Sequence, residues 1–226
     1  MTMIAENLHH VQTRMAQACV QAGRVADAVR LLAVSKTFGA DAVAQAHAAG
    51  QTAFGENYIQ EAVDKIQALR PLPLEWHCIG PIQSNKTRLV AEHFDWVHTI
   101  DRLKIAQRLS EQRPEHLAPL QVCIQVNVDG GASKSGVPTS HALELAQAVA
   151  ALPRLRLRGL MCIPEPAPDF VAACAVFTRA RALLDAMRQA GLPLDTLSMG
   201  MSGDLEAAIA EGSTQVRIGA ALYGPR

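Results

Sequence analysis

The sequence lacks an excess of charge of either sign, an apolar run of membrane-spanning length and any C-x-x-C pair. Its 226 residues carry 21 basic and 21 acidic side chains, and the isoelectric point is about 7.1. This balance gives no electrostatic attraction for nucleic acid or an anionic membrane, so we expect neither as a partner. The five cysteines form an odd set and three of them lie in apolar runs, which indicates reduced core residues.

The first residues also lack the unbroken apolar stretch of a signal peptide. Glu6, His9, His10 and Arg14 interrupt this segment, and no later apolar run approaches the length that crosses a bilayer. We therefore expect a soluble protein of the cytoplasm.

Apolar strand patterns alternate with helix patterns along the chain, after an amphipathic helix over about the first twenty residues. The expected strands cover residues 31–35, 52–55, 74–79, 95–99, 120–128, 155–162, 194–198 and 214–218. No G-x-G-x-x-G turn follows the first strand, where an open doubly wound sheet commonly has one. We therefore predict one domain over residues 1–226, an α/β fold of the TIM (β/α)8 barrel type with an extra N-terminal helix.

Lysine is scarce, with five residues against sixteen arginines, and only Lys36 closes an apolar strand. Because side chains alternate along a strand, Leu32, Val34 and Lys36 share one face, and the amine points into the barrel mouth if that face is inward. Apolar surroundings can lower the pKa of a lysine, and the neutral amine can then attack a carbonyl carbon to form a Schiff base. The alternative is an ordinary strand-end lysine that reaches into water.

Other polar residues follow strands at the same end of the predicted barrel. Arg217 and Gly219 share one face of the last strand, and Ser202 lies in a glycine-rich loop before a short helix, a natural phosphate or carboxylate site. Asn57 and Tyr58 follow the second strand, where they are either rim residues or a helix cap and a packing residue. Ser202 itself is a good candidate for an N-cap.

Two further polar segments give no cofactor site by themselves. His77 has no second histidine or acid at metal-ligand spacing, so we expect a hydrogen-bonded structural histidine and assign no metal. The loop around Lys134 lacks the glycine spacing of a nucleotide P-loop. Lys134 is either a solvated cation or a second contact for an anion.

Several ordered motifs give the chain a specific resemblance. They are AVSKT (33–37), FGENY (54–58), WHCIG (76–80), QSNK (83–86), SKSG (133–136), GLM (159–161), LSMGMS (197–202) and VRIG (216–219). With these motifs, the chain resembles the pyridoxal phosphate homeostasis protein family, a single-domain relative of the barrel of fold type III pyridoxal-phosphate enzymes such as alanine racemase.

The resemblance implies a direct binding role for five residues. Lys36 is expected to form the Schiff base with pyridoxal 5'-phosphate, and Arg217 to lie near the pyridine nitrogen. Ser202 and the backbone at Gly219 and Ala220 are expected to hold the phosphate. The position of Ala220 often carries a hydroxyl residue in this family, so a side-chain hydrogen bond to the phosphate is absent here.

The same resemblance implies that Asn57, Tyr58, Met161 and Met199 line the cofactor pocket and that Lys134 is a possible secondary contact. It implies a monomer that carries and buffers pyridoxal phosphate, with apo pyridoxal-phosphate enzymes as possible recipients. Such a protein keeps the pools of vitamin B6 and of amino or keto acids balanced. The resemblance suggests that the opposing acid/base tyrosine of a racemase comes from a second domain, and we expect no such domain here. We therefore expect no catalytic residue and no substantial turnover.

Two alternatives stay open from the sequence. One is a small fold type III racemase or lyase that uses Lys36 as its single base. The other is a barrel with a purely structural or partner-binding role.

Overall fold

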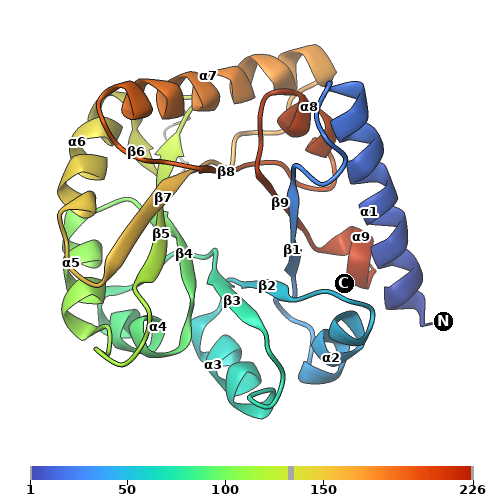
Figure 1. Cartoon of the computed structure of the whole chain (residues 1–226), viewed down its shortest axis with the longest axis horizontal. Coiled ribbons are helices and arrows are strands. Elements are labelled where there is room, and N and C mark those ends of the chain that lie inside the picture. The colour runs from blue at the N-terminus through green and yellow to red at the C-terminus, as the bar shows by residue number, and fades with distance from the viewer. Residues whose placement is uncertain (1, 132–134, 225–226) are drawn as a thin grey trace.

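The structure is a computed structural model that describes residues 2–131 and 135–224. Over these residues a ring of parallel strands closes into a barrel, and helices surround it (Figure 1). Eight strands pair in the order β1-β2-β3-β4-β5-β7-β8-β9, and β9 pairs with β1 to complete the ring. The predicted TIM barrel is therefore confirmed.

The barrel strands alternate with the outer helices along the chain. The strands are β1 (Arg30–Val34), β2 (Ala53–Glu56), β3 (Glu75–Cys78), β4 (Trp96–Ile100), β5 (Leu120–Asn127), β7 (Leu155–Met161), β8 (Thr196–Ser198) and β9 (Gln215–Ile218). The longer helices are α1 (Met3–Gln21), α2 (Ala40–Ala48), α3 (Ile59–Ala68), α4 (Thr87–His93), α5 (Leu103–Gln112), α6 (Thr139–Ala150), α7 (Phe170–Gln189) and α8 (Leu205–Ala210). The predicted N-terminal helix is α1, which lies outside the ring next to α8 and α9 (Ala220–Tyr223).

Side chains of the barrel strands form two separate apolar layers. Inside the barrel, the cluster below the mouth consists of Leu32, Val34, Ala53 and Ile79. The core between the strands and the helices includes Leu31, Ala33, Val216 and Ile218. The alternation predicted for the first and last strands is therefore confirmed, and it directs residues 32, 34, 215 and 217 toward the barrel axis.

A 3-10 turn, η1 (Ser84–Lys86), precedes α4. Two short elements were not predicted from the sequence: the strand β6 (Val137–Pro138) and α9. They are too short for a hydrophobic period to register. The predicted N-cap at Ser202 is wrong, because α8 begins at Leu205 and its N-cap is Asp204.

β7 and β8 approach each other closely at Gly159. A Cβ atom on this residue would lie 1.7 Å from the Thr196 carbonyl oxygen, so the glycine is needed for this contact. None of the helices in the described ranges is long and apolar enough to cross a membrane.

Candidate functional site

A cavity of about 300 Å³ lies at the carboxyl-terminal mouth of the barrel, where sites in this fold are found. Its lining residues are Val34, Lys36, Asn57, Ile79, Ile163, Met201, Ser202, Gly203, Arg217, Gly219 and Ala220. Six of them were predicted as site residues from the sequence. The fold therefore gathers residues that are up to 186 positions apart (34 to 220) around one space.

Lys36 is held at the start of a tight turn after β1. The Phe38 N–H donates to the Ser35 carbonyl oxygen at 3.1 Å, and Thr37 has a φ of 68°, a region that β-branched residues rarely adopt. The Thr37 N–H donates to Glu61 Oε1 at 2.8 Å. This bond to α3 stabilises the unusual backbone and so fixes the direction in which Lys36 leaves the strand.

A buried polar cluster lies directly behind this turn. Lys65 Nζ donates to Glu56 Oε1 at 2.7 Å and to the Ser35 carbonyl oxygen at 2.8 Å, and Ser35 Oγ donates to the same Glu56 oxygen at 2.6 Å. Burial raises the pKa of Glu56, and the bonds from Lys65 and Ser35 oppose that shift. Lys65 was not predicted from the sequence. It is a buried lysine whose amine joins the end of β1, β2 and α3.

Asn57 follows β2 and presents an acceptor that the protein leaves unused. Its Oδ1 atom is buried and has no hydrogen-bond partner among the described residues. The N-cap of α3 is Tyr58, so the alternative that Asn57 caps the helix is wrong. Gly80 packs against this segment, since a Cβ there would lie 2.3 Å from the Asn57 carbonyl oxygen. A buried acceptor without a partner costs free energy, which a donor on a bound ligand would recover.

Another part of the cavity wall combines small residues with backbone donors. Ser202 and Gly203 come from the loop before α8, and Gly219 and Ala220 from the start of α9. The first N–H groups of a helix have no partner within it, which favours an anion at this end. The Asp204 carboxylate is tied back into its own loop, where it accepts from the Met201 N–H at 2.7 Å.

Arg217 forms part of the cavity wall from β9 and is 4% exposed. Its Nη1 donates to Ser198 Oγ at 2.7 Å and its Nη2 to the Cys162 carbonyl oxygen at 2.9 Å. Burial lowers the pKa of this guanidinium from a very high ordinary value, so the group stays cationic. No carboxylate in the described ranges forms an ion pair with it, and its charge is therefore available to a ligand.

Three other predicted residues, Met161, Met199 and Tyr58, are not among the lining residues of this cavity. Met161 and Met199 are fully buried, and Met161 packs with Trp96 and Cys123 inside the barrel. Tyr58 is 55% exposed. Lys134 lies outside the described residues.

Five lining residues were missed from the sequence: Val34, Ile79, Ile163, Met201 and Gly203. Continued strand alternation could have indicated two of them, since Ile79 is two positions after His77 and Ile163 two positions after Met161. The described residues contain no group of three or more histidine, cysteine or acidic side chains placed to hold a metal ion.

Comparisons with known proteins agree with this architecture. The family model for the alanine racemase N-terminal domain matches residues 4–226. A pyridoxal phosphate homeostasis protein of Pseudomonas aeruginosa is 62% identical over 226 residues, which cover 100% of this chain and 97% of that protein. The homeostasis protein of Escherichia coli K12 is 54% identical over 229 aligned positions, with 100% and 98% covered.

Solved structures give the same result. PipY of Synechococcus elongatus PCC7942, with pyridoxal phosphate bound, is 36% identical with a TM-score of 0.86, and the match covers 98% of this chain and 100% of PipY. Alanine racemase of Corynebacterium glutamicum is 23% identical with a TM-score of 0.67, covering 99% of this chain and 61% of the enzyme, and so shares the fold. The protein therefore belongs to the pyridoxal phosphate homeostasis protein family, within the group that contains the alanine racemase N-terminal domain.

Proposed function

We propose that this protein binds pyridoxal 5'-phosphate at the mouth cavity and carries and buffers it, without substantial catalytic turnover. The observation that supports this most directly is the set of groups around one cavity: an amine from Lys36, a permanent cation from Arg217 and the unused Asn57 acceptor. The curated relatives at 62% and 54% identity are named as homeostasis proteins.

The lining residues fit the chemistry of this cofactor. Pyridoxal phosphate supplies an aldehyde that condenses with a primary amine, and Lys36 has the amine in this cavity. Ser202 and the backbone N–H groups of Gly219 and Ala220 are hydrogen-bond donors for the phosphate. Asn57 Oδ1 is an acceptor for a hydroxyl donor of the cofactor. Met161, Met199, Tyr58 and Lys134 stay predicted contacts.

Arg217 is proposed to face the pyridine nitrogen and to keep it unprotonated. A guanidinium stays cationic at any working pH, and a neighbouring positive charge disfavours a second cation on the ring. An unprotonated ring withdraws electrons weakly, which suits a protein that holds the cofactor without using it. Nitrogen NMR of labelled, bound cofactor tests this, and a protonated ring near neutral pH would contradict it.

The cavity also has few groups for acid/base work. Lys36 and Arg217 are the only ionisable side chains among the described lining residues. Racemisation needs proton transfer on both faces of the substrate, and general acid or base catalysis contributes about a hundred- to ten-thousand-fold per positioned group. We therefore propose that turnover is not substantial. We also propose that apo-enzymes receive the cofactor and that the protein acts as a cytoplasmic monomer.

The binding proposal is tested by absorption spectra of the purified protein with and without added pyridoxal phosphate. Borohydride reduction and peptide mapping should place the pyridoxyl group on Lys36, and Lys36→Ala should lose the absorption band. Lys104→Ala, which removes an exposed lysine on α5, is the matched control. Labelling mainly at Lys86 or Lys134 would refute the role of Lys36.

The carrier proposal is tested separately with amino acids. The loaded protein is incubated with single-enantiomer amino acids in deuterated buffer, and α-proton exchange and chirality are followed. Slow or no inversion is expected. Fast, saturable inversion that depends on Lys36 would overturn the carrier function and favour the racemase or lyase alternative.

A further inference from the structure

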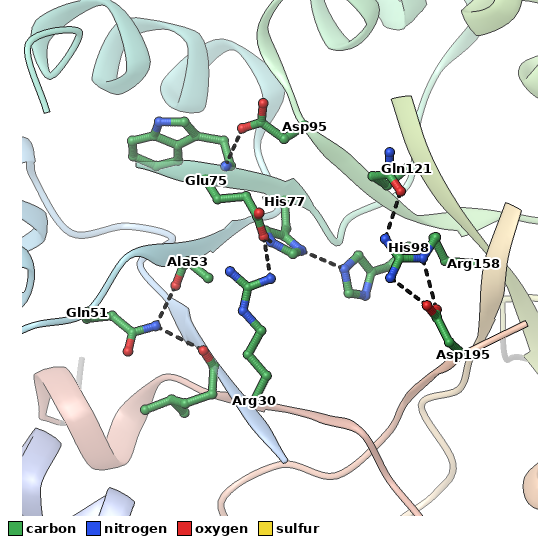
Figure 2. A network of polar contacts seen from close by, with 12 residues as sticks. Arg30, Gln51, Ala53, Glu75, His77, Asp95, His98, Gln121, Arg158 and Asp195 are labelled. Carbon is green, nitrogen blue, oxygen red and sulfur yellow. Dashed lines mark hydrogen bonds and ion pairs between the residues drawn. The ribbon is translucent and has the colours of Figure 1, made fainter. Parts of the chain in front are cut away.

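Below the mouth cavity, polar side chains form one continuous hydrogen-bonded chain across the inside of the barrel. From the cavity toward the opposite mouth its members are Arg217, Ser198, His98, His77, Glu75 and Arg30. Figure 2 shows the far half, in which Arg30, Glu75, His77 and His98 follow one another. We call this set the barrel relay.

At each link of the barrel relay, the donor and acceptor atoms lie within hydrogen-bond distance of each other. Arg217 Nη1 lies 2.7 Å from Ser198 Oγ, and that oxygen lies 2.9 Å from His98 Nδ1. His98 Nε2 lies 2.9 Å from His77 Nδ1, and His77 Nε2 lies 2.6 Å from Glu75 Oε1. Arg30 closes the far end with an ion pair of 2.7 Å to the same carboxylate oxygen.

The middle of the barrel relay is sealed from solvent and rigidly packed. Ser198, His77 and His98 have no exposed surface. The His77 ring stacks on Trp96 with 5.2 Å between centroids and 9° between planes, and the Arg158 guanidinium lies 4.8 Å from the Trp96 ring centroid. The Arg158 guanidinium also pairs with Asp195 at 2.7 Å, which helps to close this end of the barrel relay.

The two ends of the barrel relay fix the position of every proton between them. Arg217 can only donate, and the ionised Glu75 carboxylate, held by Arg30, can only accept. A neutral imidazole has one donor and one acceptor. His77 must therefore donate from Nε2 to Glu75 and accept at Nδ1 from His98 Nε2.

The same rule continues toward the cavity. His98 then accepts at Nδ1 from the Ser198 hydroxyl, and the Ser198 oxygen accepts from Arg217 Nη1. Both histidines are neutral Nε2–H tautomers. Burial lowers the pKa of each, Glu75 opposes this for His77, and the cations Arg30 and Arg217 add to it for His98.

We propose that His77 and His98 are positioning residues for the cofactor-side arginine. They force the Ser198 hydroxyl to donate away from Arg217, so its oxygen can only accept from the guanidinium. One of the five N–H donors of Arg217 is thereby held on Ser198, and the Cys162 carbonyl oxygen independently accepts a second. The orientation of the cation in the cavity is set by a chain that ends at the opposite mouth of the barrel.

This inference rests on the proposed function only where it concerns the cofactor. The proton arrangement is a property of the protein alone. The first test is therefore nitrogen NMR of the ligand-free protein at pH 7. Nε2–H signals are expected for both histidines. A protonated Nδ1 on either ring, or an imidazolium, would overturn the inference whether or not the protein binds pyridoxal phosphate.

The second test uses matched variants and the absorption spectrum and affinity of added pyridoxal phosphate. His98→Leu and Ser198→Ala each break the barrel relay, and a hydrogen bond to a charged group corresponds to about a ten- to hundredfold change in affinity. Affinity should fall by about that factor, with a shifted absorption band. His98→Gln, which keeps one acceptor and one donor, should retain the affinity and the absorption band of the wild type.

The control is Gln51→Leu. Gln51 is buried at the same end of the barrel and donates to the Leu31 and Ala53 carbonyl oxygens, but it is not part of the barrel relay. Loss of the Gln51 amide should lower the stability of the protein and leave the absorption spectrum of bound pyridoxal phosphate unchanged. A spectrum and affinity in folded Ser198→Ala equal to those of the wild type would refute the positioning role. If the wild type binds no pyridoxal phosphate, the proposed function fails and the tautomers alone decide the inference.

Discussion

Lowering the pH from 7 to 5 is expected to destabilise this protein through two buried histidines. His77 and His98 are neutral in the folded protein because burial lowers the pKa of both, whereas in the unfolded chain they take up protons below about pH 6.5. The unfolded state then binds more protons than the folded state. Stability is therefore complete above pH 6.5 and is lost as the pH falls below it.

The size of the effect follows from proton linkage. For each histidine that stays neutral in the folded protein, the free energy of unfolding falls by about 2 kcal/mol between pH 7 and pH 5. Glu75 opposes the shift at His77, so the pair should contribute between about 2 and about 4 kcal/mol. With a urea m-value of about 3 kcal/mol per molar for a domain of this size, the midpoint should fall by about 1 M.

Urea denaturation at both pH values measures this loss in the wild type and in His98→Gln. The variant keeps the hydrogen bonds but cannot take up a proton, so its loss should be smaller by about 2 kcal/mol. The raised pKa of Glu56 opposes the loss in both proteins and cancels in the comparison. His141→Gln, at an exposed position on α6, should behave as the wild type does. Equal losses in the wild type and His98→Gln would refute the reasoning.

Two further substitutions test the support of the site. Gly80→Ala should weaken binding of pyridoxal phosphate and lower the melting temperature, because the added Cβ would displace Asn57. The control is Gly39→Ala, whose Cβ would meet no atom within 4 Å and should change neither quantity. Titration with pyridoxal phosphate and thermal melting measure the two effects. Lys65→Met should cost about 3–5 kcal/mol in urea denaturation because the buried Glu56 loses its ion-pair partner, and adding Glu56→Gln should recover at least half. A loss below about 1 kcal/mol from Lys65→Met would contradict a buried ion pair.

The sequence by itself determined the barrel, because its signals are local. The alternation at Leu32 and Val34 gave the inward face of β1, and the same period gave the inward direction of Arg217 on β9. Since parallel strands place their carboxyl ends at one mouth, Lys36, Asn57, Ser202 and Arg217 could be assigned to one rim before any contact was known. Short elements such as the four-residue α9 were not predicted, since one helical turn is too short to show a repeating pattern.

Only the tertiary structure decided which of these side chains meet and in what state of protonation. His77 and His98 are 21 residues apart on neighbouring strands, and nothing local distinguishes a buried pair from two separate histidines. Their register, the distance to Ser198 a further 100 residues along the chain and their complete burial follow from closure of the barrel. A pKa depends on the charges and solvent around a group in space, so it is fixed by packing between strands and not by the residues next to it in sequence.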